Sequence, residues 1–205
     1  MNIRGWLSLA AGSLCVAVPV SAASAAGFAP LAEWQSSAGV LFEQAGGEMA
    51  RGWNNTLGVG VSRLAAYPGA DSRRTFVSPV IDIRYRDRWF ASTEEGLGFN
   101  FPGPSTVRTG LALGYDFGRP SSSGPAHDLP GINAAPEIKF FAEKLFMPVV
   151  VRGDLRRALG GYGGWVADLS GYAALPLGQS VVIFAGPSIT AADSRYFRSY
   201  YARPG

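Results

Sequence analysis

Few residues in this chain have the type and spacing that catalysis requires. His127 is the only histidine, and it lies in a stretch rich in serine and proline that favours a solvated loop. Glu94 and Glu95 supply the two carboxylates that acid–base catalysis uses, but neighbouring side chains on a strand point to opposite faces. A turn or a solvated edge is the better interpretation of this pair, and we predict that the protein is not an enzyme.

Two glycine-rich stretches are candidates for binding loops. Gly58-Val59-Gly60 lacks the third glycine and the following helix of a nucleotide-binding loop. The second stretch is predicted to be the loop of a hairpin, and it is our candidate partner-contact loop because glycine lets another backbone approach closely. It consists of Gly160, Gly161, Tyr162, Gly163 and Gly164. No pattern in the sequence indicates a cofactor or a metal ion.

A set of charged residues alternates with apolar ones, so its members are expected to share one face of a sheet. Two interpretations remain open for this set. The charges form a salt-bridge network that plugs the interior, or they line a path for solutes. The set comprises Asp82, Arg84, Arg86, Arg108, Asp116, Arg152, Asp154 and Arg156.

The first 25 residues have the features of a cleaved signal peptide. Arg4 precedes an apolar run over residues 6–20, and Ala23-Ser24-Ala25 supplies the small residues of a cleavage site. The run is shorter than the roughly 20 residues that a spanning helix needs. Cys15, the only cysteine, lies inside it, so the mature chain is expected to lack disulfides. Residues 26–52 are expected to form a periplasmic lead-in, with a short strand at residues 38–43.

The composition favours a β-rich protein and disfavours nucleic-acid binding. Charged residues make up only 16% and there are 27 glycines, which is not the profile of a disordered chain. All of the 18 basic residues except Lys139 and Lys144 are arginines, whose planar fork suits phosphate. They are spread along the chain and not clustered, so phospholipid or lipopolysaccharide is a better partner than nucleic acid. A base-composition bias of the source genome explains the arginines equally well.

From residue 54 onward, apolar and polar residues alternate with period 2. The clearest example sets Ile81, Ile83 and Tyr85 against Asp82, Arg84 and Arg86. Such a strand needs an apolar environment on one face and water on the other, and most of these stretches are about 9–12 residues long, as a membrane-crossing strand requires. We therefore predict an all-β fold, a transmembrane antiparallel β-barrel over residues 53–205. Aromatic residues near strand ends are expected to form girdles: Trp89, Phe90, Phe99, Phe101, Tyr115 and Phe117.

Two other folds fit the sequence less well. A soluble β-sandwich also has alternating strands, but its inner positions are apolar, whereas here they are polar and glycine-rich. A membrane helix between Asp168 and Asp193 is interrupted by glycines and prolines, and a last strand over 181–190 is expected there. The sequence does not decide whether residues 88–101 form one strand or break at 93–96. The long loop over 118–131 is expected to face the cell exterior.

Several stretches, in their order and spacing, resemble the MipA/OmpV family of outer-membrane proteins. They are Tyr67-Pro68-Gly69-Ala70-Asp71, residues 79–85, residues 96–100, residues 114–119, residues 154–164, and Gly186-Pro187-Ser188-Ile189-Thr190 leading into residues 196–201. The resemblance covers roughly residues 56–201. It implies a barrel in the outer membrane of a Gram-negative bacterium, inserted by the barrel-assembly machinery, with no catalytic motif to carry over.

The resemblance also implies a function. Some family members are scaffolds that hold a lytic transglycosylase beside a penicillin-binding synthase, and others are known as antigens or adhesins. A narrow channel is the alternative that the charged residues allow. Members of the family continue with further strands to a terminal aromatic residue, whereas this chain stops at Gly205. The barrel is therefore expected to be incomplete at its C-terminus, as a fragment or a truncated gene product.

Overall fold

A computed structural model describes most of the chain beyond residue 51. The described residues are 14–17, 34, 37–38, 40–41, 44–45, 52–65, 73–116, 118, 131–177 and 181–201. They form one sheet of eleven strands, one short helix, α2 (Ser194–Tyr201), and a set of helical residues at 34, 37–38, 40–41 and 44–45. The strands are β1 (Leu14–Ala17), β2 (Trp53–Ala65), β3 (Arg73–Tyr85), β4 (Trp89–Ser92), β5 (Gly96–Asn100), β6 (Val107–Asp116), β7 (Ala135–Phe146), β8 (Val149–Ala158), β9 (Trp165–Leu177), β10 (Val181–Ala185) and β11 (Ser188–Ala192).

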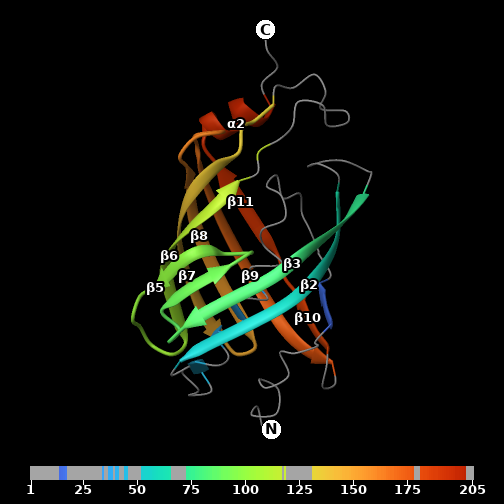
Figure 1. Ribbon diagram of the computed structural model, residues 1–205, viewed down its shortest axis with the longest axis vertical. Coiled ribbons are helices and arrows are strands. Elements are labelled where there is room, and N and C mark those ends of the chain that lie inside the picture. Colours follow the sequence, from blue (N-terminus) through green and yellow to red (C-terminus); the bar gives the residue numbers. More distant parts are fainter. Residues whose placement is uncertain are drawn as a thin grey trace.

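The strands follow one another round a rolled sheet (Figure 1). From β2 to β10 each strand pairs antiparallel with the next one in the sequence, and β1 is added parallel to β10. In the described residues β2 and β1, the two edges of the sheet, are not paired with each other. The fold is thus an antiparallel barrel whose wall is rolled but not closed. No helix in the described part of the chain is long and apolar enough to cross a membrane.

Two interruptions explain the strand number. The stretch over residues 88–101 does break, because Thr93, Glu94 and Glu95 form the turn between β4 and β5. The antiparallel order then brings the end of β2 and the end of β6 to the same edge of the wall. Farther along, β10 and β11 pair with β9 in a single register on both sides of Gly186-Pro187, where proline has no N–H to donate. The predicted last strand is therefore one strand with a gap in its ladder.

Along the strands charged side chains are buried inside and apolar side chains are exposed outside, as the alternation predicted. On β7 every second residue is buried, and the buried ones include Glu137, Lys139 and Glu143. Their neighbours Ile138 and Phe140 are exposed on the outer face. A water-soluble sheet would hide the aliphatic face and expose the charged one. The predicted transmembrane barrel polarity is therefore confirmed for these strands.

Aromatic residues mark one rim of the outer face. Trp53, Tyr85, Trp89 and Phe99 stand side by side in the register of β2 to β5, and their neighbouring rings lie 4.7–4.9 Å apart at the Trp53–Tyr85 and Trp89–Phe99 pairs. Such a row is typical of an aromatic girdle. The prediction that Phe90 belongs to the girdle is wrong, because Phe90 follows Trp89 on the strand and therefore points inward, where it is buried.

The segment before β2 contributes helical residues to the barrel interior. Trp34 stacks on Tyr172 of β9 at 4.9 Å between ring centroids, and its indole N–H donates to Ser170 Oγ at 3.2 Å. Ala38 and Leu41, one turn and two turns farther along, join the same apolar cluster. The predicted short strand at 38–43 is wrong, because Ala38 and Leu41 are helical and their spacing gives them one buried face.

Candidate functional site

A cluster of buried ions lies inside the barrel around Glu95. The turn between β4 and β5 carries this carboxylate inward, and only 1% of Glu95 is exposed. Arg108 of β6 binds it with both terminal nitrogens, at 2.8 and 2.9 Å. Arg84 of β3 approaches the same carboxylate at 2.9 Å and Arg152 of β8 at 3.3 Å. One acidic side chain therefore joins strands on opposite sides of the turn.

A second buried carboxylate extends the cluster along β7. Glu143 receives the guanidinium groups of Arg108, at 3.3 Å, and of Arg152. Asp82 and Asp154 complete it, at 2.9 Å from Arg84 and 3.4 Å from Arg152. Three guanidinium groups thus face four carboxylates, so positive charge is neutralised within the cluster. Buried charges are tolerated only when they are paired in this way.

Two phenylalanine rings pack against the guanidinium groups. Arg108 lies 4.6 Å from the ring centroid of Phe141 and 5.2 Å from that of Phe90, and Arg152 lies 5.4 Å from Phe141. Both rings are fully buried and meet edge to face at 6.0 Å. Asn100 orients Arg108 further by accepting its Nε–H at 3.0 Å. Phenylalanine rings, carboxylates and an amide therefore hold the arginines in one geometry.

A layer of tyrosines lies toward α2. The hydroxyl of Tyr162 donates to Glu137, and Tyr200 of α2 donates to Asp116 at 3.2 Å. Tyr196 packs edge to face on Tyr162 at 4.9 Å and stacks on Tyr200 at 4.4 Å. Burial, and then the bond to Glu137, raise the pKa of Tyr162 above its usual range. Burial raises the pKa of Tyr200 as well, so the hydroxyls of Tyr162 and Tyr200 stay protonated and donate to Glu137 and Asp116.

The helix that closes this layer is capped by Asp193. Its Oδ1 accepts the backbone N–H of Tyr196 at 2.8 Å, as an N-cap residue does. That bond is the main reason why the pKa of Asp193 lies below its ordinary value, and the nearby Arg195 acts in the same direction. Since the folded-state pKa is depressed, the cap stabilises α2 above the unfolded-state value, about 3.9. This contribution is lost as the pH falls through the folded-state pKa.

We therefore expect the docking of α2 to be constant from pH 7 to about pH 4 and to loosen below that value. A spin label at the exposed position Arg198→Cys reports the change as increased mobility. Asparagine caps helices about as well as aspartate but does not titrate. Asp193→Asn should remove the part of the transition that belongs to Asp193, and an unchanged pH profile in that variant would contradict the assignment.

The structure brings most of the predicted inward charges together but not all of them. Five of them meet in the ion cluster: Asp82, Arg84, Arg108, Arg152 and Asp154. Arg156 pairs with Asp168 at 3.0 Å, and Asp116 belongs to the tyrosine layer. The prediction for Arg86 is wrong, because β3 ends at Tyr85 and Arg86 lies exposed in the following turn, over the Tyr85 ring.

The candidate loop at residues 160–164 is a fixed turn between β8 and β9. Tyr162 points inward from it, and α2 holds its backbone, since Ser199 donates to Tyr162 O at 3.2 Å and Arg195 to Gly163 O at 3.4 Å. Gly161 and Gly163 have φ angles of 55° and 62°, which favour glycine. The backbone of this loop is therefore occupied by contacts within the chain, and a partner would meet its outer rim.

Several residues of the interior were not singled out from the sequence. Glu95 was assigned to a turn or a solvated edge; the turn is correct, but the side chain is buried. Glu137 and Glu143 lie on the inner face of β7, as the alternation indicates, and the available signal for Glu143 was its place opposite Arg108 and Arg152. Tyr196 and Tyr200 are four residues apart, which is a helical spacing that was overlooked. His127 lies outside the described residues, within which no group of three His, Cys, Asp or Glu is arranged to hold a metal ion.

The comparisons with known proteins give one result. Searches of curated proteins and of solved structures found no match. A family model described as MltA-interacting protein MipA matches residues 57–202, which includes every strand from β3 to β11 and most of β2. Since the match spans well over half of the chain and the whole of the ion cluster, this chain belongs to the MipA family.

Proposed function

We propose that the protein is an outer-membrane scaffold that binds a murein-cleaving lytic transglycosylase of the MltA type. The observation that carries the proposal is membership of a family described by that interaction, over residues 57–202. The apolar outer face of the wall and the aromatic row at its rim support a location in the outer membrane. Export would remove residues 1–25, and with them β1, from the mature barrel.

The connections between strands suggest which rim faces the periplasm. At the α2 end the links include residues 66–72 and 117–134, whereas at the other end they are as short as residues 86–88 and 147–148. Barrels of this class have short periplasmic turns and longer external loops. The rim with the short turns, which is also the rim near Trp34, would then face the murein and any enzyme that acts on it.

That periplasmic rim is our proposed contact surface for the enzyme. It carries exposed residues of two kinds, the cations Arg86 and Arg88 and the apolar Phe101 and Met147. Met147 is 56% exposed although it is a large apolar residue. Exposed apolar groups beside arginines are frequent at protein interfaces. The loop at residues 160–164 remains a competing prediction, since it lies at the opposite rim.

Photo-crosslinking separates the two surfaces. A photoreactive amino acid at Met147 should capture an MltA-type enzyme in cells, whereas the same group at Leu159, an exposed residue beside the 160–164 loop, should not. Capture at Leu159 alone would assign the contact to the loop. Capture at neither position, with a barrel that is inserted and heat-modifiable, would contradict the scaffold. A penicillin-binding synthase should be recovered in the same complex only when the transglycosylase is present.

The filled interior favours a scaffold over a channel. Glu95, Arg108 and Glu143 form a buried ion cluster on the inner face of β5 to β7. Trp34 and Leu41 pack inside the barrel against β7 to β10, nearer the proposed periplasmic rim. We expect the protein to show no steady conductance in a planar lipid bilayer. A stable, ion-selective current from the purified wild-type protein would contradict this prediction and revive the solute path.

A further inference from the structure

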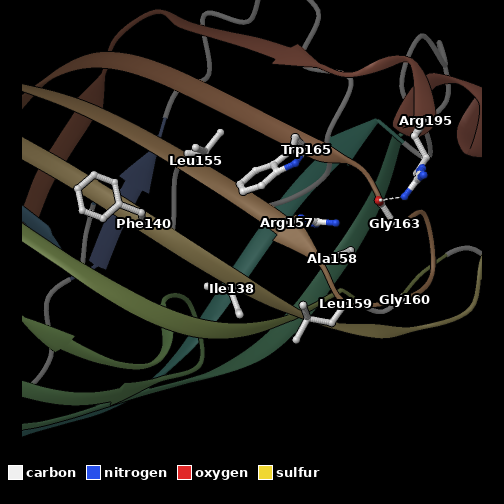
Figure 2. A pocket seen from close by; sticks show the side chains of 10 residues that line it. All are labelled: Ile138, Phe140, Leu155, Arg157, Ala158, Leu159, Gly160, Gly163, Trp165 and Arg195. Carbon is white, nitrogen blue, oxygen red and sulfur yellow. Dashed lines mark hydrogen bonds between the residues drawn. The ribbon is translucent and has the colours of Figure 1, made fainter.

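A groove runs down the outer face of the wall near α2 (Figure 2). It has a volume of about 720 Å³, and its floor is made by exposed apolar residues of β7, β8 and β9. These are Ile138, Phe140, Leu155 and Trp165. The β8–β9 turn and α2 close its upper end. The floor faces the place where lipid chains lie around a barrel, so the groove is open to an amphipathic lipid.

Two arginines stand at the closed end of the groove. Arg157 points outward from β8 with its guanidinium 5.1 Å from the ring centroid of Trp165, and Arg195 reaches down from α2 to Gly163 O at 3.4 Å. Figure 2 shows both guanidinium groups at the same end, beyond the apolar floor. In the described part of the chain neither forms a salt bridge; the nearby Asp193 carboxylate caps α2. Both arginines therefore keep N–H donors for an external acceptor.

The position of Arg157 indicates at which depth in the membrane the groove lies. An arginine on the lipid face costs about 2–4 kcal/mol at the bilayer midplane and almost nothing at the interface. Arg157 is the next-to-last residue of β8, opposite Trp165 in the register, and tryptophan is favoured at the interface. The arginines thus lie at the level of lipid headgroups, and the apolar floor extends from them toward the membrane interior.

We propose that this groove binds lipid A, the phosphorylated glycolipid anchor of lipopolysaccharide, with a phosphate on Arg157 and Arg195 and acyl chains along the floor. The inference rests on the outer-membrane location proposed above. Guanidinium groups pair with phosphate in bidentate geometry, which explains the charge at the closed end. The α2 end carries the longer connections and so faces the outside, where this glycolipid, and not phospholipid, forms the leaflet.

Lipid competition tests the site. The full-length protein is placed in nanodiscs, and binding of bisphosphorylated lipid A is measured against dephosphorylated lipid A and phosphatidylglycerol. We expect lipid A to bind at least about tenfold more tightly than either, since dephosphorylated lipid A lacks the charge-assisted contacts and phosphatidylglycerol offers only a singly charged phosphodiester and two acyl chains. Equal binding of phosphatidylglycerol would overturn the proposal in favour of a general anionic-lipid surface.

Matched variants assign the binding to the groove. The double variant Arg157→Gln/Arg195→Gln should weaken lipid A binding about tenfold or more, whereas Arg198→Gln, on the exposed side of α2, should leave it within about twofold. Wild-type affinity in the double variant would overturn the proposal. Crosslinking of the transglycosylase at Met147 should be unchanged in both variants, so failure of the lipid site and failure of the scaffold give different results.

Discussion

Replacing Glu95 with glutamine is expected to lower the free energy of unfolding by about 3–5 kcal/mol, because it removes the one buried carboxylate that three guanidinium groups share. Glu95 accepts hydrogen bonds or ion pairs from Arg84, Arg108 and Arg152 at 2.8–3.3 Å. The glutamine side chain has the same shape, so the packing around it is retained while one negative charge is lost. Each arginine keeps at least one carboxylate, but Arg108 loses its two short ion-pair contacts and retains only Glu143, at 3.3 Å.

Urea unfolding of the protein in lipid vesicles, followed by tryptophan fluorescence, measures this effect. Glu94→Gln is the matched control, since Glu94 belongs to the same turn but is only half-buried and lies outside the cluster around Arg108. Its effect should stay near that of an ordinary surface substitution, about 0.5 kcal/mol or less. Equal midpoints for the two variants would show that the cluster contributes no net stability.

The wall of the barrel was predictable because the pattern that defines it lies within each single strand. A strand with lipid on one side and water or ions on the other must alternate with period 2, and that pattern is visible in Ile81, Asp82 and Ile83 without knowledge of any partner strand. The inward direction of Arg84, Arg108 and Arg152 follows from the same parity. The family resemblance agrees with the match over residues 57–202.

The interior was less predictable, because alternation along a strand tells which way a side chain points but not which residue it contacts. Whether Glu95 is solvated depends on where the β4–β5 turn lies relative to Arg108, which is set by the strand pairings and not by the alternation within one strand. Alternation also stops predicting the direction of a side chain where the strand ends, and Arg86, which follows the last residue of β3, is an example. The helical residues at Trp34 and Leu41 acquire their burial only from β9 and its neighbours, so their own segment gave no strong period.

Exchanging Phe141 for alanine is expected to destabilise the barrel by about 3–5 kcal/mol, the usual range for a buried phenylalanine. Phe141 is fully buried and lies under Arg108 and Arg152 at 4.6 and 5.4 Å. Its loss removes ring contacts from two guanidinium groups and leaves a cavity beside the ion cluster. The Phe141 ring and the ion cluster are in contact, so their effects are coupled. The double variant Phe141→Ala/Glu95→Gln should therefore lose less free energy of unfolding than the sum of the two single losses.

Phe140→Ala is the decisive comparison, because Phe140 is the adjacent residue of β7 and is 45% exposed on the outer face. In a lipid bilayer the acyl chains are as apolar as the side chain they replace, so this substitution should cost about 1 kcal/mol or less. In a water-soluble sheet the order of the two effects would be reversed, with the aliphatic face forming the core. Urea titrations of both variants in lipid vesicles therefore test the polarity of the wall, and a larger loss for Phe140→Ala would refute the membrane barrel and the lipid groove built on its outer face.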